Sequence, residues 1–138
     1  MTRGFGLMLS RANVGQHRYL IRKISWHYGS PMNNLYDRIP VSLPEEAFEV
    51  FLEMSGCTIK RIVSRGHRSP DGFWFDQECH EWVTLLQGSA TLRFEGESSF
   101  TMEAGDCLNI PAHTRHRVES TDVDQDTIWL AVYYPNTD

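Results

Sequence analysis

The sequence has no apolar run as long as the ~18 residues that cross a membrane as a helix, so no membrane span is predicted. It also lacks internal repeats and low-complexity tracts, and its 138 residues are enough for one globular domain. GxSxG, Walker A and HExxH motifs are absent as well. No catalytic class is therefore indicated by a local motif.

Cysteine is scarce, with three residues, Cys57, Cys79 and Cys107, that are far apart and form no CxxC pair. The odd number and the wide spacing argue against a disulfide framework and against a zinc site made of cysteines. We predict buried free thiols, which are typical of a protein in the reducing cytoplasm.

Acidic residues are absent from residues 1–31, which hold five of the 13 basic residues. The remainder carries all 18 acidic residues and a net charge of −10, which disfavours binding to nucleic acid or anionic membranes. We predict a basic extension over 1–31 that is dispensable for folding, and a single domain over 32–138. Met32 is then a plausible true start. A transit peptide, or a strand over residues 19–24 that covers a barrel edge, are alternatives for the extension.

One helix is predicted after Ser42, because residues 42–45 match a capping box with proline in the first turn. An apolar stripe with helical spacing follows, made of Ala47, Phe48, Phe51 and Leu52. Four glutamates, including Glu46 and Glu49, would then face water, and Ser55-Gly56 would end the helix. We expect this short helix to pack outside the sheet.

From Cys57 onward the pattern is typical of short strands ended by turns. Ala90, Leu92 and Phe94 alternate with polar residues, which is the period of a half-buried strand. The close, regular spacing of such segments favours an all-β barrel or sandwich. Residues 81–86 and 128–132 are apolar on both faces, which indicates a second layer or a partner subunit.

Two polar side chains share inward-pointing strand faces with apolar ones. Glu81 alternates in phase with Val83 and Leu85, and His116 with Val118. A buried acid and a buried imidazole need partners, because unpaired buried charge is costly. A metal ion would satisfy both side chains, as would a direct Glu–His pair or water.

This stretch resembles the two sequence motifs of the cupin superfamily. Glu81 and Gly88 have the spacing that ends the first motif, and the second motif is matched by Gly105, Pro111 and His116. The resemblance extends over about residues 33–135. It implies a small jelly-roll β-barrel and, because small cupins often dimerise, a homodimer.

The sequence departs from the cupin pattern where the first motif has a His-any-His pair. The matching positions are Phe75 and Gln77, or Trp74 and Asp76, depending on the alignment. The resemblance then implies that Glu81 and His116, completed by Gln77 or Asp76, bind a divalent transition metal such as Zn, Fe, Mn, Ni or Cu. The pocket-lining candidates are Phe75, His80, Val83, His113 and Val118.

Two functions that use the barrel interior remain open, beside that of a purely structural or interaction domain, and neither names a substrate. The first is a metal-dependent oxygenase, isomerase or lyase that acts on a small molecule. The second is a module that binds a small ligand without metal and without turnover. The missing histidine pair favours the second, while the inward-pointing Glu81 and His116 favour the first.

Overall fold

A computed structural model describes residues 9–14, 17–23 and 32–137, in which all regular structure is β-strand. The strands form a seven-stranded and a three-stranded sheet, in the orders β1-β2-β3-β4-β10-β5-β8 and β7-β6-β9. Their bounds are β1 Leu9–Val14, β2 His17–Lys23, β3 Ala47–Met54, β4 Cys57–Ser64, β5 His80–Gln87, β6 Ser89–Phe94, β7 Phe100–Glu103, β8 Cys107–Ile110, β9 His116–Thr121 and β10 Thr127–Tyr134.

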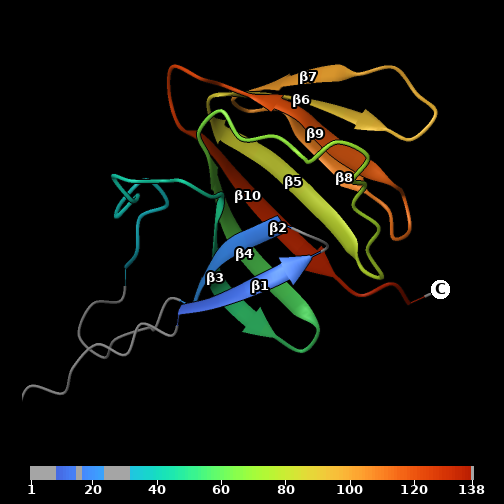
Figure 1. Cartoon of the computed structure of the whole chain (residues 1–138). Coiled ribbons are helices and arrows are strands. Elements are labelled where there is room, and N and C mark those ends of the chain that lie inside the picture. Colours follow the sequence, from blue (N-terminus) through green and yellow to red (C-terminus); the bar gives the residue numbers. More distant parts are fainter. Residues whose placement is uncertain (1–8, 15–16, 24–31, 138) are drawn as a thin grey trace, which may run out of the picture.

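The two sheets pack face to face, with β7, β6 and β9 across the top of Figure 1 and β5 and β10 beneath them. Side chains from both sheets share one core, in which Leu85 and Ala131 of the larger sheet accompany Leu92 and Met102 of the smaller one. Neighbouring strands are antiparallel except for β2 and β3, which are parallel. This arrangement confirms the predicted all-β jelly-roll barrel.

The predicted helix after Ser42 is wrong, because Ala47–Met54 is strand β3. It pairs with β4 from Ala47–Val63 to Met54–Cys57, and residues 42–45 belong to the preceding loop. A register shift between Val50 and Leu52 breaks the strict alternation of the strand. This bulge makes the apolar residues recur at a spacing that imitates a helix, and sheet pairing overrides the local capping signal.

The outer face of β3 and β4 is covered by the chain's own loop before β3. Ile39 and Leu43 of this loop pack on Ala47 and Val63. Buried Arg61 of β4 makes an ion pair with Glu49, a residue that the helix prediction had placed in water. The chain itself thus supplies a second layer over this part of the sheet.

The Arg61 side chain also holds the loop in place by donating hydrogen bonds to main-chain oxygens of the loop. Its guanidinium donates from Nη1 to the carbonyl oxygens of Leu35 and Asp37, at 2.7 and 2.6 Å. Its Nε donates to Glu49 Oε2 at 2.7 Å. One buried cation therefore joins two strands and the covering loop, with its hydrogen-bonding capacity largely used.

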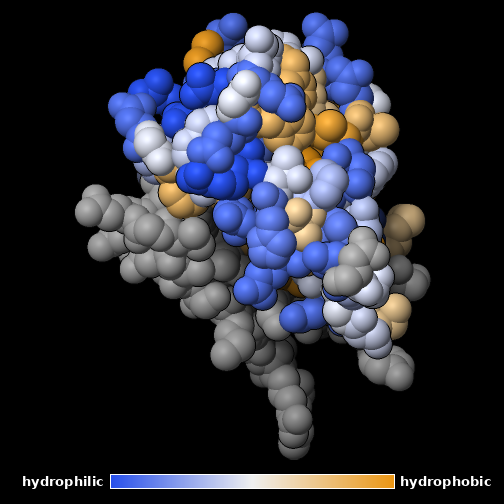
Figure 2. Space-filling model, turned by 90° about the vertical axis from the view of Figure 1, so that its right-hand side faces the viewer, coloured by the Kyte–Doolittle hydropathy of each residue, from blue (hydrophilic) through white to orange (hydrophobic). Residues whose placement is uncertain are grey.

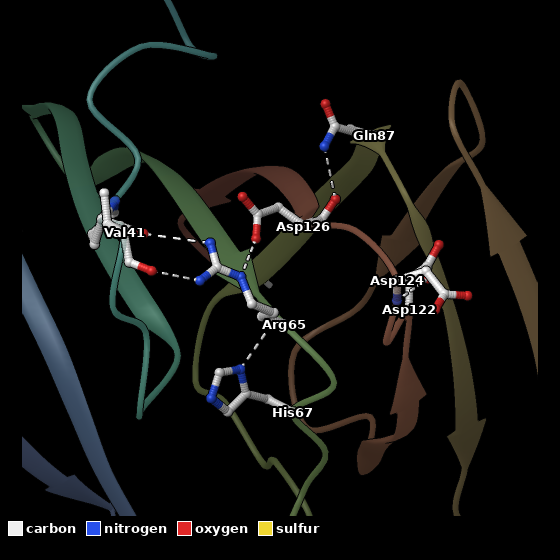
Figure 3. A network of polar contacts seen from close by, with 8 residues as sticks. Val41, Arg65, His67, Gln87, Asp122, Asp124 and Asp126 are labelled. Carbon is white, nitrogen blue, oxygen red and sulfur yellow. Dashed lines mark hydrogen bonds and ion pairs between the residues drawn. The ribbon is translucent and has the colours of Figure 1, made fainter.

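A second arginine holds the same loop, where the chain leaves β4 (Figure 3). Arg65 Nε donates to Asp126 Oδ1 at 2.6 Å and Nη1 donates to the carbonyl oxygen of Val41 at 2.8 Å. The hydrogen bond to Asp126 raises the pKa of Arg65, which stays charged. Gln87 completes the network by donating to the main-chain oxygen of Asp126 at 3.0 Å.

Gly88 has a steric reason to be glycine. Its φ is +77°, and a Cβ atom there would lie 2.6 Å from Thr127 Oγ1 and 2.8 Å from Thr127 Cα. A side chain would push β10 away from the turn between β5 and β6. The glycine that ends the first motif therefore sets the packing of the strand that carries Glu81.

The side of the molecule seen in Figure 2 is mainly hydrophilic, with an apolar area in its upper half. Within the described residues, the structure contains no helix that is both long enough and apolar enough to cross a membrane. Cys57, Cys79 and Cys107 are free thiols. Cys107 is exposed and the other two are half-buried, so the prediction of buried thiols is wrong for Cys107.

Candidate functional site

A cavity of about 560 Å³ lies inside the barrel. Its apolar wall comes from strands of both sheets and includes Phe48, Ile62, Val83, Leu92, Ile110 and Val118. Polar side chains interrupt this wall at a few points, the arrangement that small-molecule sites usually show.

Glu81 and His116 meet at one of these points. β5 and β9 present them to the cavity from opposite sheets, both are buried, and Glu81 Oε2 lies 3.8 Å from His116 Nε2. His116 Nδ1 is 2.8 Å from the carbonyl oxygen of Thr114, which can only accept a hydrogen bond. The imidazole therefore carries a proton on Nδ1 and turns Nε2 toward the carboxylate.

Two further side chains contact the Glu81 carboxylate. Gln77 Nε2 donates to Oε2 at 2.7 Å, and the Tyr133 hydroxyl donates to Oε1 at 3.2 Å. Burial, together with the negative charge of Glu81, raises the pKa of Tyr133 well above its usual value of 10. The phenol therefore keeps its proton and remains a donor to Glu81 at physiological pH.

Of the four predicted metal ligands, three gather at this point and the fourth does not. Gln77 joins Glu81 and His116, whereas Asp76 contacts His113, with Oδ1 3.1 Å from Nδ1. The side chains of His113 and Asp76 are 62% and 51% exposed, so this pair sits at the surface. Asp76 still borders the cavity, but its carboxylate has a partner of its own.

The cavity wall contains three of the five predicted lining residues, Phe75, Val83 and Val118. Phe75 also stacks on His116, with ring centroids 5.5 Å apart. His80 and His113 lie outside the wall. His80 faces away from Glu81 because neighbours on a strand alternate, and its Nδ1 accepts a hydrogen bond from the main-chain nitrogen of Ala112 at 3.0 Å.

Sequence reasoning missed a second polar group, in which Glu46 and Trp129 line the cavity and the buried Ser64 joins them. Trp129 Nε1 donates to Ser64 Oγ at 3.1 Å, and the Ser64 hydroxyl donates to Glu46 Oε1. Burial raises the pKa of Glu46, against the smaller lowering effect of the Ser64 hydrogen bond. The helix prediction concealed this residue by assigning it to a water-facing surface.

The donor set is small for a metal centre. Across the described residues, no three or more His, Cys, Asp and Glu side chains come together in a group that could bind an ion. Glu81 and His116 offer two suitable donors, and the amide oxygen of Gln77 is a neutral third. Such a set fits an ion only in an open site, where water or a ligand fills the remaining positions.

The fold and the cavity define a class of protein, the small β-barrel with an interior cavity. The family model described as "Cupin domain" matches residues 66–133. A solved structure from Ralstonia eutropha JMP134, provisionally named as a mannose-6-phosphate isomerase, is 44% identical to this chain. The match covers 78% of this chain and 100% of that one, with a TM-score of 0.74. The chain therefore belongs to the cupin superfamily.

More distant structures share the fold. A cupin superfamily protein from Desulfitobacterium hafniense DCB-2 is 15% identical, with a TM-score of 0.59, over 71% of this chain and 84% of that one. A cupin family protein with a double-stranded β-helix fold, from Methanocaldococcus jannaschii, is 16% identical, with a TM-score of 0.56, over 70% and 86%. A comparison with curated proteins found no match.

Proposed function

We propose that this cupin binds a small molecule in its cavity and holds a divalent transition metal, Zn, Fe, Mn, Ni or Cu, between Glu81 and His116. The observation that carries the proposal is the approach of His116 Nε2 to Glu81 Oε2 at 3.8 Å, with the Nδ1 proton committed to Thr114. A nitrogen lone pair that faces a carboxylate oxygen at this separation favours a cation or a proton between them.

The residues around this pair would orient it for chemistry. Tyr133 and Gln77 hold the carboxylate at both oxygens, while the Phe75 ring stacks on the imidazole. A bound metal would supply Lewis acidity toward an oxygen of the ligand. The apolar wall would keep water from the remainder of the ligand.

Among metal-dependent reactions, isomerisation has the most support. The 44% identical protein from Ralstonia eutropha carries the name of an isomerase. Isomerases commonly need a group that accepts a proton from one carbon and returns it to another. In a metal-dependent isomerisation Glu81 and His116 would hold the metal, which would polarise a substrate oxygen beside those carbons.

The alternative function is binding of a small ligand without metal and without turnover. A specific observation favours it, because Gln77 and Tyr133 already donate to both oxygens of Glu81. The carboxylate is thus satisfied by neutral donors. A metal would have to displace the Gln77 amide hydrogens or accept a weaker site.

Elemental analysis of the purified full chain tests the metal. We expect bound transition metal in proportion to protein, and a lower melting temperature after chelation, since a ligand that binds only the folded state stabilises it by about 2.7 kcal/mol at 100 times its Kd. Affinity should fall at acidic pH, because the ligating side chains must be deprotonated to bind a metal.

A pair of histidine variants gives the control. His116→Ala should lose the metal, whereas His67→Ala should retain it, because His67 lies outside the cavity wall and accepts from the main-chain nitrogen of Arg65. Absence of stoichiometric metal, with no thermal shift on adding Zn, Mn, Fe, Ni or Cu, would leave the metal-free binding module as the function.

We also propose that the protein is a cytoplasmic homodimer. Leu52, Ile59, Val132 and Trp82 stand directly opposite one another across β3, β4, β10 and β5. This row lies on the outer face of the sheet, and Leu52 and Trp82 are among its exposed large apolar side chains. A continuous apolar row on an antiparallel sheet favours contact with a second copy. Three free thiols favour the reducing cytoplasm.

A further inference from the structure

The cavity has one strongly basic side chain among the described residues of its wall, Lys60. It lies on the inner face of β4 between Thr58 and Ile62, which also line the cavity. Its Nζ is 4.7 Å from the centre of the Tyr133 ring. A positive charge therefore stands beside the polar group that holds Glu81.

Lys60 has no anionic partner in the part of the chain that the structure describes. Its contact with Tyr133 is a cation–π contact, and no hydrogen bond or ion pair joins it to a described residue. The nearby acids are already engaged. Glu81 is held by Gln77 and Tyr133, and Glu46 accepts from Ser64.

Lys60 is half-buried, and its ammonium group would lose further hydration when a ligand fills the cavity, which is costly when nothing pairs with it. A cation–π contact offsets only part of that cost. The wall is thus electrostatically incomplete at Lys60. A ligand with a negative charge at this point would complete it.

We infer that the ligand of this cavity is a small organic acid with one carboxylate, which pairs with Lys60 Nζ while its apolar part contacts Phe48, Ile62 and Val83. This inference rests on the proposed function, in which the cavity binds a small molecule. It adds the chemical class of that molecule and the residue that recognises it.

A single carboxylate suits this cavity better than a phosphate. Phosphate groups are usually held by several cationic or main-chain donors, often at a helix N-terminus. Of the described residues, the wall offers one lysine, and three acids, Glu46, Asp76 and Glu81, that would repel a doubly charged group. The ligand class therefore differs from the sugar phosphate in the name of the Ralstonia eutropha protein.

Titration of the full chain with benzoate and with benzamide tests the inference, because the two probes share shape but differ in charge. Binding is followed by calorimetry and by the NMR signal of the Trp129 indole N–H, which lies on the cavity wall. We expect benzoate to bind on the order of tenfold more tightly than benzamide, the effect of one charge-assisted contact. Mannose 6-phosphate is the third probe, and we expect it to bind more weakly than benzoate.

Three variants locate the effect. Lys60→Met, which keeps the length of the side chain, should bring benzoate to the affinity of benzamide, and Lys60→Arg should restore most of the preference. Arg68→Met removes one positive charge from an exposed loop outside the cavity wall and should change nothing. Circular dichroism of each variant establishes that it is folded.

The outcomes separate this inference from the proposed function. Equal affinity for benzoate and benzamide, tighter binding of mannose 6-phosphate, or a preference that survives Lys60→Met would overturn the carboxylate inference and leave the ligand cavity standing. Failure of all three probes to bind would overturn both the inference and the proposal of small-molecule binding.

Discussion

Two properties of Glu46 should make the free energy of unfolding depend on whether its carboxyl group is ionised. It lines the cavity, and burial raises the pKa of its carboxyl group above the usual 4.5. In the unfolded chain the same group titrates near its ordinary value, so the folded state holds the proton more tightly. Folding should therefore gain stability as the pH falls from neutral toward about 4.5, and lose that gain as the pH rises through the folded pKa.

Glu46→Gln should remove this dependence, because the amide oxygen still accepts from Ser64 while no proton is lost at neutral pH. We expect the melting temperature of the variant to exceed that of the parent at pH 7 and to match it near pH 4.5. Thermal melts from pH 4.5 to 8 provide the measurement. Glu45→Gln, at the next position in the chain, is the control. A constant difference between parent and variant at all pH values would contradict the assignment.

At the scale of single residues, the sequence could predict Glu81 and His116 because both occupy inward positions and match spaced motifs. Tyr133 could not be assigned, since its hydroxyl reaches Glu81 only because β10 pairs with β5 so that these two residues stand opposite each other. The position of Lys60 on the cavity wall likewise depends on how distant strands pair. Such pairings are set by tertiary structure and leave no local signal.

At the scale of elements, β3 shows how a local signal loses to sheet pairing. Residues 42–45 satisfy a helix cap, yet Ala47–Met54 gains a ladder with β4 and buries Ala47, Val50 and Phe51. The later strands were predictable because Gly88, Gly96 and Pro111 end them at regular intervals. In β3 the bulge interrupts the alternation of apolar and polar residues, so the strand could not be predicted from that pattern.

The buried ion pair on β3 and β4 gives the prediction for this scale. Arg61→Ala leaves Glu49 without this cation and frees the carbonyl groups of Leu35 and Asp37. Removing one partner of a buried pair typically costs about 3–5 kcal/mol, and we expect a loss in that range. Urea unfolding monitored by tryptophan fluorescence measures it.

Arg115→Ala is the matched control for this loss. Arg115 pairs with Glu95 at the surface, where both side chains are about half exposed, and such pairs contribute about 0–1 kcal/mol. If Arg61→Ala were no more destabilising than Arg115→Ala, the covering loop would not depend on the buried pair.

At the scale of the whole molecule, the barrel as a class could be predicted from regular strand spacing and the cupin resemblance. What covers the sheet could not, because two-faced apolar strands fit a covering loop and a second subunit equally well. The larger sheet has a part that the loop covers and a part that carries exposed apolar side chains. The loop before β3 covers Ala47 and Val63, while the row from Leu52 to Trp82 includes exposed apolar side chains.

The dispensability of residues 1–31 stays a prediction, and it can be tested together with the dimer. β2 pairs with β3 over four positions, Leu20–Ala47 to Lys23–Val50, while β4 pairs with β3 along nearly its whole length. A chain that begins at Met32 therefore loses one neighbour of β3 and keeps the pairings that close the barrel. We expect it to fold with the same strand-rich far-UV dichroism as the full chain.

Analytical ultracentrifugation at micromolar concentration then compares three proteins. The full chain should sediment at twice the 15.9 kDa of one copy, and the chain from Met32 at twice its own, smaller mass. Trp82→Glu should sediment as a folded single copy, because it places an unpaired charge in the proposed contact. A full chain that sediments as one copy would refute the dimer, and an unfolded or insoluble chain from Met32 would refute the dispensable extension.

A shortened chain that folds but no longer pairs would instead assign the contact to residues 1–31, which would place the interface at β1 and β2 and leave the row at Trp82 free.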